Sequence, residues 1–221
     1  TSVGGITFDG GETLTTATSD AQGRVSVLVR SGNVATPVRV TAFIELESGE
    51  VIFVQSNILT ITTGIPDQNS VTLALDKFVV EGADIAGPEV LVTAFLGDRF
   101  NNQVPDGTAV NFTTEGGLID PSCTTVNSQC SVTWRAQNPV PFDHRSTIMA
   151  YAIGNETYYD KNGSGIFDNG DEFDDLPEAF RDDDENGIYD PDQTDSFSNN
   201  FSKDEMFVDY DGSVDYSVPD G

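Results

Sequence analysis

The first 152 residues alternate apolar and polar side chains in short runs. Successive side chains of a β-strand point to opposite faces, so a period of two predicts half-buried strands. Two early runs, RVSVLVR and VRVTAFIE, place apolar residues at every second position: Val25, Val27 and Val29, then Val38, Val40, Ala42 and Ile44. The ESGE stretch at 47–50 predicts a hairpin turn before the strand runs VIFVQS and ILTITT.

The same alternation returns after residues 64–69, a polar, turn-forming stretch and the best candidate for a linker. The run PEVLVTAFLGD places four apolar residues on one face: Val90, Val92, Ala94 and Leu96. In CSVTWRAQ, Val132 and Trp134 alternate in the same way. Core packing is the simplest role for Trp134, and stacking against a sugar is the alternative.

Strands at this spacing, with glycine-rich and proline-rich turns, predict an Ig-like β-sandwich. The strands before the linker are too few for a complete sandwich. The fold class expected is therefore mainly β, with a partial Ig-like unit at 1–64 and a full one at 65–152. An irregular acidic segment at 153–221 follows.

Charge is concentrated in that last segment. Of 37 acidic and 10 basic residues, 21 acidic and 3 basic lie at 153–221, and the whole chain carries a net charge of −27. Such a field repels nucleic acid and anionic lipid, so neither is an expected partner. The sequence has no apolar run long enough to cross a bilayer, so no membrane insertion is expected in this segment. Bound divalent cations would offset the repulsion.

The acidic segment contains one pattern twice, 22 residues apart. Asp160, Asn162, Ser164, Gly165, Phe167 and Asp168 recur as Asp182, Asp184, Asn186, Gly187, Tyr189 and Asp190. Oxygen side chains at positions 1, 3, 5 and 9, with glycine at 6, have the ligand spacing of an EF-hand calcium loop. Position 7 contributes its backbone carbonyl, here from Ile166 and Ile188. Phe167 and Tyr189 at position 8 are expected to turn away from the ion and pack.

Position 12 departs from the EF-hand pattern, which has a bidentate glutamate there. It is Asp171 in the first loop and Gln193 in the second, so weaker binding is expected, and Asp192 can substitute in the second. An acidic run is often only a solvated or disordered surface. Such a run has no reason to repeat a glycine and an aromatic residue in register with its carboxylates. Calcium binding is therefore the preferred interpretation.

Residues 174–181, DDLPEAFR, join the two loops. Asp175 is expected to cap a single helical turn with Pro177 at its start, and Phe180 to pack near Phe173. The connection is too short for the long helices that flank an EF-hand. The loops are therefore expected to be rigid staples rather than a sensor that opens.

In the tail, three aspartates are spaced for a third, irregular ion site, or could lend ligands to the first two: Asp209, Asp211 and Asp215. Two Ca²⁺ ions are expected, and whether the tail completes a third site is open.

Three pieces resemble the bacterial Ig-like repeats of the invasin/intimin type: SDAQGRVSVLVRSG, VTAFLGDRFNNQVPDGTAVNFTTEGG and CSVTWRAQNP. The likeness covers residues 1–152. The acidic segment is similar to calcium loops that follow such repeats in large bacterial surface proteins, and to dockerin and thrombospondin type 3 repeats. The resemblance implies a location outside the cell or on the bacterial surface. It also implies a structural or adhesive role without catalysis.

Cys123 and Cys130 are the only cysteines. In an exported protein of this kind a disulfide across a hairpin loop is the expected state. A zinc or redox site is the alternative, but the chain has no second ligand pair and no C-x-x-C spacing.

Motifs for catalysis are lacking. His144 is the sole histidine, no serine or cysteine motif points to a nucleophile, and H-E-x-x-H, Walker and dinucleotide patterns do not occur. An enzyme is therefore not expected.

The function expected is an extracellular structural or adhesive segment of a larger bacterial surface protein, stiffened by calcium. Its partners would be neighbouring Ig-like repeats or copies of itself. Two alternatives stay open. One is a filament subunit assembled by β-strand complementation. The other is a calcium-dependent module that recognises a cell-surface glycan or protein.

Overall fold

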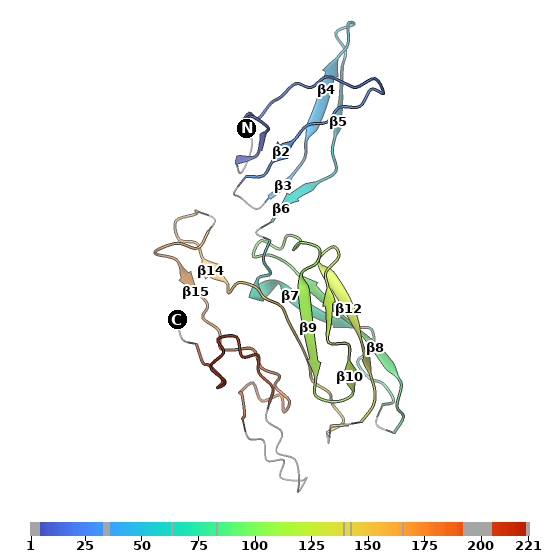
Figure 1. Cartoon of the computed structure of the whole chain (residues 1–221), viewed down its shortest axis with the longest axis vertical. Coiled ribbons are helices and arrows are strands. Elements are labelled where there is room, and N and C mark those ends of the chain that lie inside the picture. The colour runs from blue at the N-terminus through green and yellow to red at the C-terminus, as the bar shows by residue number, and fades with distance from the viewer. Residues whose placement is uncertain are drawn as a thin grey trace.

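The computed structural model describes residues 5–32, 36–62, 64–82, 84–138, 140–141, 143–164, 166–191 and 205–219. Within them the chain is mainly β, as expected, and its strands pair in several antiparallel sheets (Figure 1). A short 3₁₀ turn, η2, spans Gln68–Ser70. The proposed domain boundaries at 64 and 152 stay predictions.

The middle of the chain forms two sheets that enclose the hydrophobic core. One sheet has the strand order β10-β12-β8-β7 and the other β11-β9-β13. The bounds of these strands are β7 Val71–Leu75, β8 Glu89–Leu96, β9 Ala109–Thr114, β10 Leu118–Ile119, β11 Ser122–Thr124, β12 Gln129–Arg135 and β13 Ile148–Tyr151.

Strand β8 is the centre of this core. Its alternation buries the four predicted residues, Val90, Val92, Ala94 and Leu96, and leaves the residues between them more exposed. On β12, Val132 pairs with Val92 and Trp134 with Val90, so both strands turn apolar side chains to the same face. Burying each large apolar side chain stabilises the fold by roughly 1.5–3 kcal/mol.

Trp134 packs against this core, as the simpler of its two predicted roles requires. Its indole N–H donates to the carbonyl of Gly116 at 2.9 Å and to the hydroxyl of Thr114 at 3.1 Å. Gly117 has φ +74°, and a Cβ there would lie 2.6 Å from the indole ring. Only glycine accommodates both the backbone conformation and the close approach.

The expected disulfide between Cys123 and Cys130 is present. It joins β11 in one sheet to β12 in the other, so it fastens the two layers together. Closing a loop of this length stabilises the fold by about 2.5 kcal/mol in the chain-entropy model.

The first unit is less regular than its alternation predicted. Its strands pair two by two as β1–β2, β3–β6 and β4–β5, in a lobe apart from the sandwich (Figure 1). Their bounds are β1 Thr7–Phe8, β2 Val29–Arg30, β3 Thr36–Val38, β4 Thr41–Glu45, β5 Val51–Gln55 and β6 Leu59–Ile61. None of the described residues at 5–62 is buried.

The run RVSVLVR therefore keeps only its last two residues as a strand, and Val25 and Val27 are exposed. The second run is divided between β3 and β4, and Ile44 at its end is also exposed. The expectation of one continuous half-buried strand in each run is wrong, because no opposing sheet within the described ranges covers these residues.

The predicted linker is ordered at its centre. The buried Asp67 caps η2, and its side chain accepts a hydrogen bond from the N–H of Asn69 at 3.1 Å. The N–H of Asn155, at the start of the acidic segment, donates to the carbonyl of Pro66 at 2.8 Å. This stretch is thus a point where the acidic segment attaches.

Asp120 links the sandwich strands through a carboxylate whose pKa is lowered. The N–H of Thr133 and the guanidinium of Arg135 both donate to it, at 3.1 and 3.0 Å, and lower its pKa below the ordinary 3.8. A carboxylate with a depressed pKa stabilises the fold above its unfolded-state value, and this contribution is lost as the pH falls through the lowered pKa.

We therefore predict that Asp120→Asn lowers the melting temperature at pH 7. The difference from wild type should shrink as the pH falls below 3.8, where the wild-type carboxyl takes up its proton. Melting curves from pH 7 to pH 2.5 measure this, with Asp84→Asn as a charge-matched control. A difference that stays constant over that range would contradict the assignment.

Candidate metal centre

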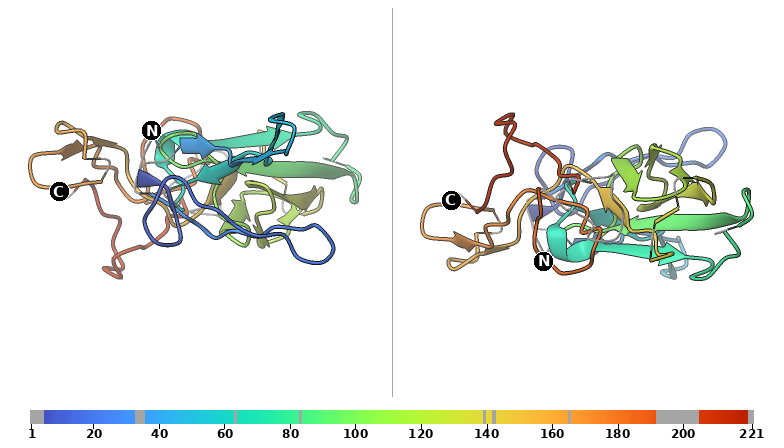
Figure 2. Two further views of the ribbon diagram at one scale, coloured as in Figure 1. Left: turned by 90° about the horizontal axis from the view of Figure 1, so that it is seen from above. Right: turned by 90° about the horizontal axis from the view of Figure 1, so that it is seen from below.

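The acidic segment lies beside the sandwich in both views of Figure 2. In three of its loops the first aspartate accepts hydrogen bonds from backbone N–H groups later in the loop: the first loop at 160–171, the second at 182–190 and the third at 209–217. The predicted Gly165, Asp192 and Gln193 lie outside the described residues.

In the first loop, aspartate and asparagine side chains bend the backbone toward one point. Asp160 accepts hydrogen bonds from the N–H groups of Gly163 and Ser164, at 2.7 and 3.0 Å. Asn162 accepts from Ser164 at 2.8 Å and donates to the carboxylate of Asp168 at 2.8 Å. Positions 1, 3, 5 and 9 of the pattern are therefore brought together.

Asp171, at position 12, closes the first loop. One of its oxygens accepts from the N–H of Lys161 at position 2, and the other from Asp168 at position 9, each at 3.0 Å. Ile166 at position 7 is exposed and receives the Ser164 hydroxyl on its carbonyl at 2.9 Å.

The second loop curls in the same way. Asp182 accepts from the N–H groups of Asn186 and Gly187, at 3.0 and 2.8 Å. The amide of Asn186 donates to the carboxylates of Asp184 and Asp190, at 2.9 and 2.8 Å. Ile188 is exposed, as in the first loop.

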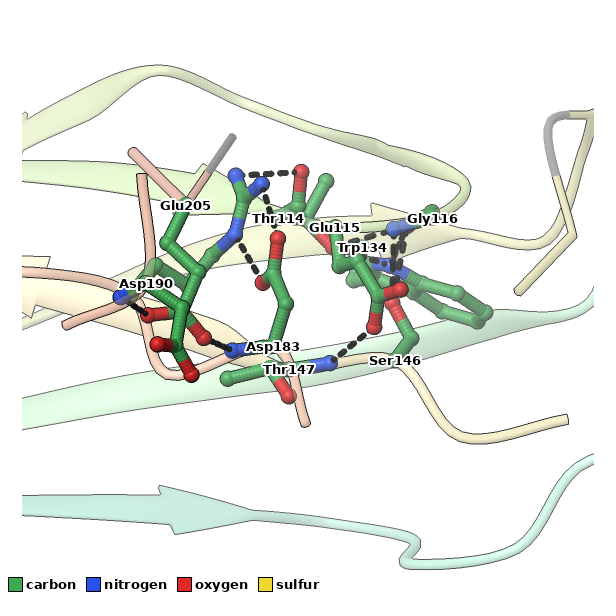
Figure 3. A network of polar contacts seen from close by, with 10 residues as sticks. Thr114, Glu115, Gly116, Trp134, Ser146, Thr147, Asp183, Asp190 and Glu205 are labelled. Carbon is green, nitrogen blue, oxygen red and sulfur yellow. Dashed lines mark hydrogen bonds and ion pairs between the residues drawn. The ribbon is translucent and has the colours of Figure 1, made fainter. Parts of the chain in front are cut away.

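Glu205 closes the second loop from outside it (Figure 3). Its carboxylate accepts from the N–H of Asp183 at position 2 and of Asp190 at position 9, at 2.8 and 3.0 Å. Glu205 is only 2% exposed, and oxygens of Asp182, Asp184 and Glu205 lie within 4.8 Å of one another. It thus takes the place that position 12 has in the first loop.

The third loop is built on the predicted tail aspartates. Asp209 accepts from the N–H of Gly212 at 2.6 Å and of Val214 at 3.2 Å. Asp211 accepts from the N–H of Ser213 at 2.7 Å. The Ser213 hydroxyl, and then its N–H, lower the pKa of the Asp211 carboxyl, which favours the charged form.

Glu178 closes the third loop. Its carboxylate accepts from the N–H of Tyr210 at position 2 and of Ser217 at position 9, at 2.8 and 3.0 Å. Oxygens of Glu178, Asp209 and Asp211 lie within 4.8 Å of one another. Asp215 is exposed and stands at position 7, where its backbone carbonyl accepts from the Ser213 hydroxyl.

Two groups of three carboxylates therefore gather among the described residues, one in the second loop and one in the third. Sequence reasoning named four of these six carboxylates as candidate ligands and missed both glutamates. The signal that could have found them is their common place in the chain, because each stands four residues before a loop's first aspartate.

Aromatic residues at position 8 turn away from the loops and pack, as predicted. Phe167 contacts Tyr158 and Phe173 with ring centroids 5.5 and 5.8 Å apart. Tyr189 stacks on Tyr216 of the third loop, at 4.1 Å.

The connection at 174–181 has no helical turn, contrary to the expectation. It is extended because the N–H of Asp174 donates to the Thr157 carbonyl and that of Leu176 to Glu156, at 2.8 and 2.9 Å. Phe173 lies instead in the ribbon of β14 (Tyr158–Tyr159) and β15 (Glu172–Phe173). The predicted contact of Phe180 with Phe173 is replaced by contacts with Tyr189 and Tyr216.

Arg181 attaches this segment to the sandwich. Its buried guanidinium donates to both carboxylate oxygens of Asp183, at 2.5 and 2.8 Å, and to the carbonyl of Thr114 at the end of β9, at 2.9 Å. At the other end, Arg99 lies 3.6 Å from the ring centre of Tyr158 and donates to its carbonyl. Two arginines therefore hold the loops against the sandwich.

His144 lies with Trp134 on a cavity of about 570 Å³ in the sandwich. Its imidazole makes no hydrogen bond within the described part of the chain. No helix among the described residues has the length and apolar character needed to cross a membrane.

Comparison of this chain with protein-family models, with curated proteins and with solved structures finds no match.

We predict that Arg181→Ala destabilises the attachment by about 3 kcal/mol, because it removes one partner of a buried ion pair. Chemical denaturation should show the loss, and limited proteolysis should show new cleavage within 176–219. Arg24→Ala is the matched control, since its ion pair with Asp20 is exposed and contributes little. Equal effects of the two substitutions would contradict the role given to Arg181.

Proposed function

We propose that this chain is an extracellular structural segment of a bacterial surface protein, in which calcium ions fold the acidic segment and fix it against the β-sandwich. The observation that carries the proposal is the gathering of three carboxylates in each of two loops. Charges of one sign at this separation repel one another, and a bound cation converts the repulsion into attraction.

Calcium fits the donor set better than other common ions. Every candidate side-chain ligand offers oxygen, from carboxylates, an amide or hydroxyls, and the loops contain neither histidine nor cysteine. Hard oxygen donors favour Ca²⁺ and Mg²⁺ over zinc and copper. A flexible loop with many oxygens suits the six to eight ligands of Ca²⁺ better than the strict octahedron of Mg²⁺.

The mechanism is mechanical. An ion in the second loop would hold Asp182, Asp184 and Glu205 together, next to the Asp183–Arg181 pair that contacts β9. Ordering of the loop would thereby also stabilise its contact with the sandwich. The bound ions would set the angle between the two parts and stiffen the whole segment.

An extracellular setting is supported by the disulfide, because such bonds persist mainly in oxidising compartments. Calcium outside cells is of millimolar order, which suits loops of modest affinity. The resemblance of residues 1–152 to bacterial Ig-like repeats supports the same setting and the structural role.

We predict that removing calcium with excess EDTA lowers the melting temperature and opens residues 153–221 to protease. Each site stabilises the fold by about 2.7 kcal/mol when free calcium is one hundred times the Kd. Calorimetry and mass-mapped proteolysis measure the two effects, and added calcium should reverse both.

Asp182→Asn should weaken the response to calcium, whereas Asp84→Asn, which removes one charge outside the acidic segment, should leave it unchanged. An identical melt and digestion pattern with calcium and with EDTA would contradict the proposal.

A second function, assembly by strand addition, is favoured by the first unit. Among the described residues β4 and β5 pair only with each other. Phe43 and Phe53, which face each other across this ribbon, are 62% and 71% exposed. An incomplete sheet with exposed apolar side chains can accept a strand from another copy of the chain.

We predict that the protein self-associates as its concentration rises and that Phe53→Ser abolishes this. Phe78→Ser removes an even more exposed phenylalanine (86%) from the sandwich unit and should leave the association unchanged. Sedimentation velocity measures both. A wild-type monomer at every concentration would contradict strand addition and leave the calcium proposal untouched.

A further inference from the structure

The second and third loops belong to a repeat of 27 residues that includes the glutamate before each loop. Its members occupy the same places in both copies: Glu178, Phe180, Asp182, Asp184, Asn186 and Tyr189, and then Glu205, Phe207, Asp209, Asp211, Ser213 and Tyr216. The first and second loops begin 22 residues apart, whereas the second and third begin 27 residues apart. A search for the 22-residue spacing therefore does not find this repeat.

The glutamate of each copy closes the loop of the other copy. Glu178 stands four residues before the second loop, yet it accepts from the third loop's position 2 and position 9 amides. Glu205 stands four residues before the third loop and accepts from the same two positions of the second loop. The distances agree as well, at 2.8 and 3.0 Å in both loops.

The backbones of the two copies are joined where the exchange occurs. The N–H of Arg181 donates to the carbonyl of Met206 at 2.7 Å, and the N–H of Val208 to that of Ala179 at 2.8 Å. Phe180 and Phe207 form an antiparallel bridge between these contacts. The two glutamates thus extend from one short two-stranded ribbon in opposite directions.

The aromatic side chains follow the same two-fold relation. Tyr189 and Tyr216 stack on each other. Phe180 lies edge-on to Tyr216, and Phe207 edge-on to Tyr189, with centroids 5.8 and 5.5 Å apart. The two copies are therefore in contact through backbone hydrogen bonds, aromatic packing and the closing carboxylates, so a structural change in one copy affects the other.

We propose that the second and third loops form one cooperative unit, in which Glu178 positions the third loop for its ion and Glu205 positions the second. This inference rests on the proposed calcium function. An ion bound in the second loop holds Glu205 in place, and Glu205 stands four residues before Asp209, the first residue of the third loop. Binding in one loop thereby prepares the other, and the coupling acts equally in both directions.

The first loop is outside this unit because its own Asp171 closes it. Its ion should therefore bind independently, which provides an internal reference for the coupling.

The test uses Glu178→Gln and Glu205→Gln in the full chain, with amide hydrogen exchange followed by NMR in calcium and in EDTA. Glu178→Gln should raise the exchange rate at Tyr210 and Ser217 about tenfold and change Asp183 and Asp190 less. Glu205→Gln should do the reverse. Glu172→Gln removes the same charge from an exposed ion pair and should change none of the four amides.

Calcium titration gives the second measurement. Either substitution should weaken binding in both loops about tenfold and leave the first loop unchanged. If Glu178→Gln exposes the amides of the second loop instead, or if all four are unprotected in the wild type under both conditions, the inference fails.

The two proposals fail separately. Crossed exchange effects without calcium binding would preserve the exchanged glutamates and overturn the calcium function. Three ions that bind with independent affinities would preserve the calcium function and overturn the coupling.

Discussion

The acidic segment depends on one kind of contact, in which a single carboxylate accepts hydrogen bonds from two backbone amides of one curled loop. Asp171, Glu205 and Glu178 make it in the first, second and third loops. The contact joins position 2 to position 9 and so closes the ring of oxygens. It also draws negative charges together in a segment with a large acidic excess. Under the proposed function, a cation bound in these loops would offset the repulsion between the gathered charges.

The sandwich supplies what such loops lack, a rigid support. Every second residue of β8 is buried, as are Cys130 and Val132 of β12, and the two sheets are joined by the disulfide. Arg181 contacts the end of β9 directly. Elements of this kind open rarely, whereas loops with few buried contacts open easily. Ions that order the loops would therefore make the acidic segment a rigid extension of the sandwich. The sandwich itself would be rigid without them.

The sequence predicted correctly those features that depend on residues close together in the chain. The inward residues of β8 and the positions of Asp182 and Asp184 follow from patterns that span a few neighbouring residues. The closing glutamates could not be found in this way, since Glu205 acts on a loop that begins 23 residues earlier. The alternation also overestimated the length and burial of the strands in the first unit. Such a pattern shows which face of a strand could be buried but not whether a second sheet covers it. The predicted helical turn at 174–181 is absent because the N–H groups of Asp174 and Leu176 donate to Thr157 and Glu156 instead, and local propensity does not include such distant acceptors.

The most direct measurement of the central claim is the calcium content of the protein. Equilibrium dialysis against millimolar calcium, followed by elemental analysis, counts the ions held by each chain. The account predicts two to three ions per chain, with the second and third loops filling together. A value well below one ion per chain would contradict it, and the closed loops would then be a purely structural feature of the backbone.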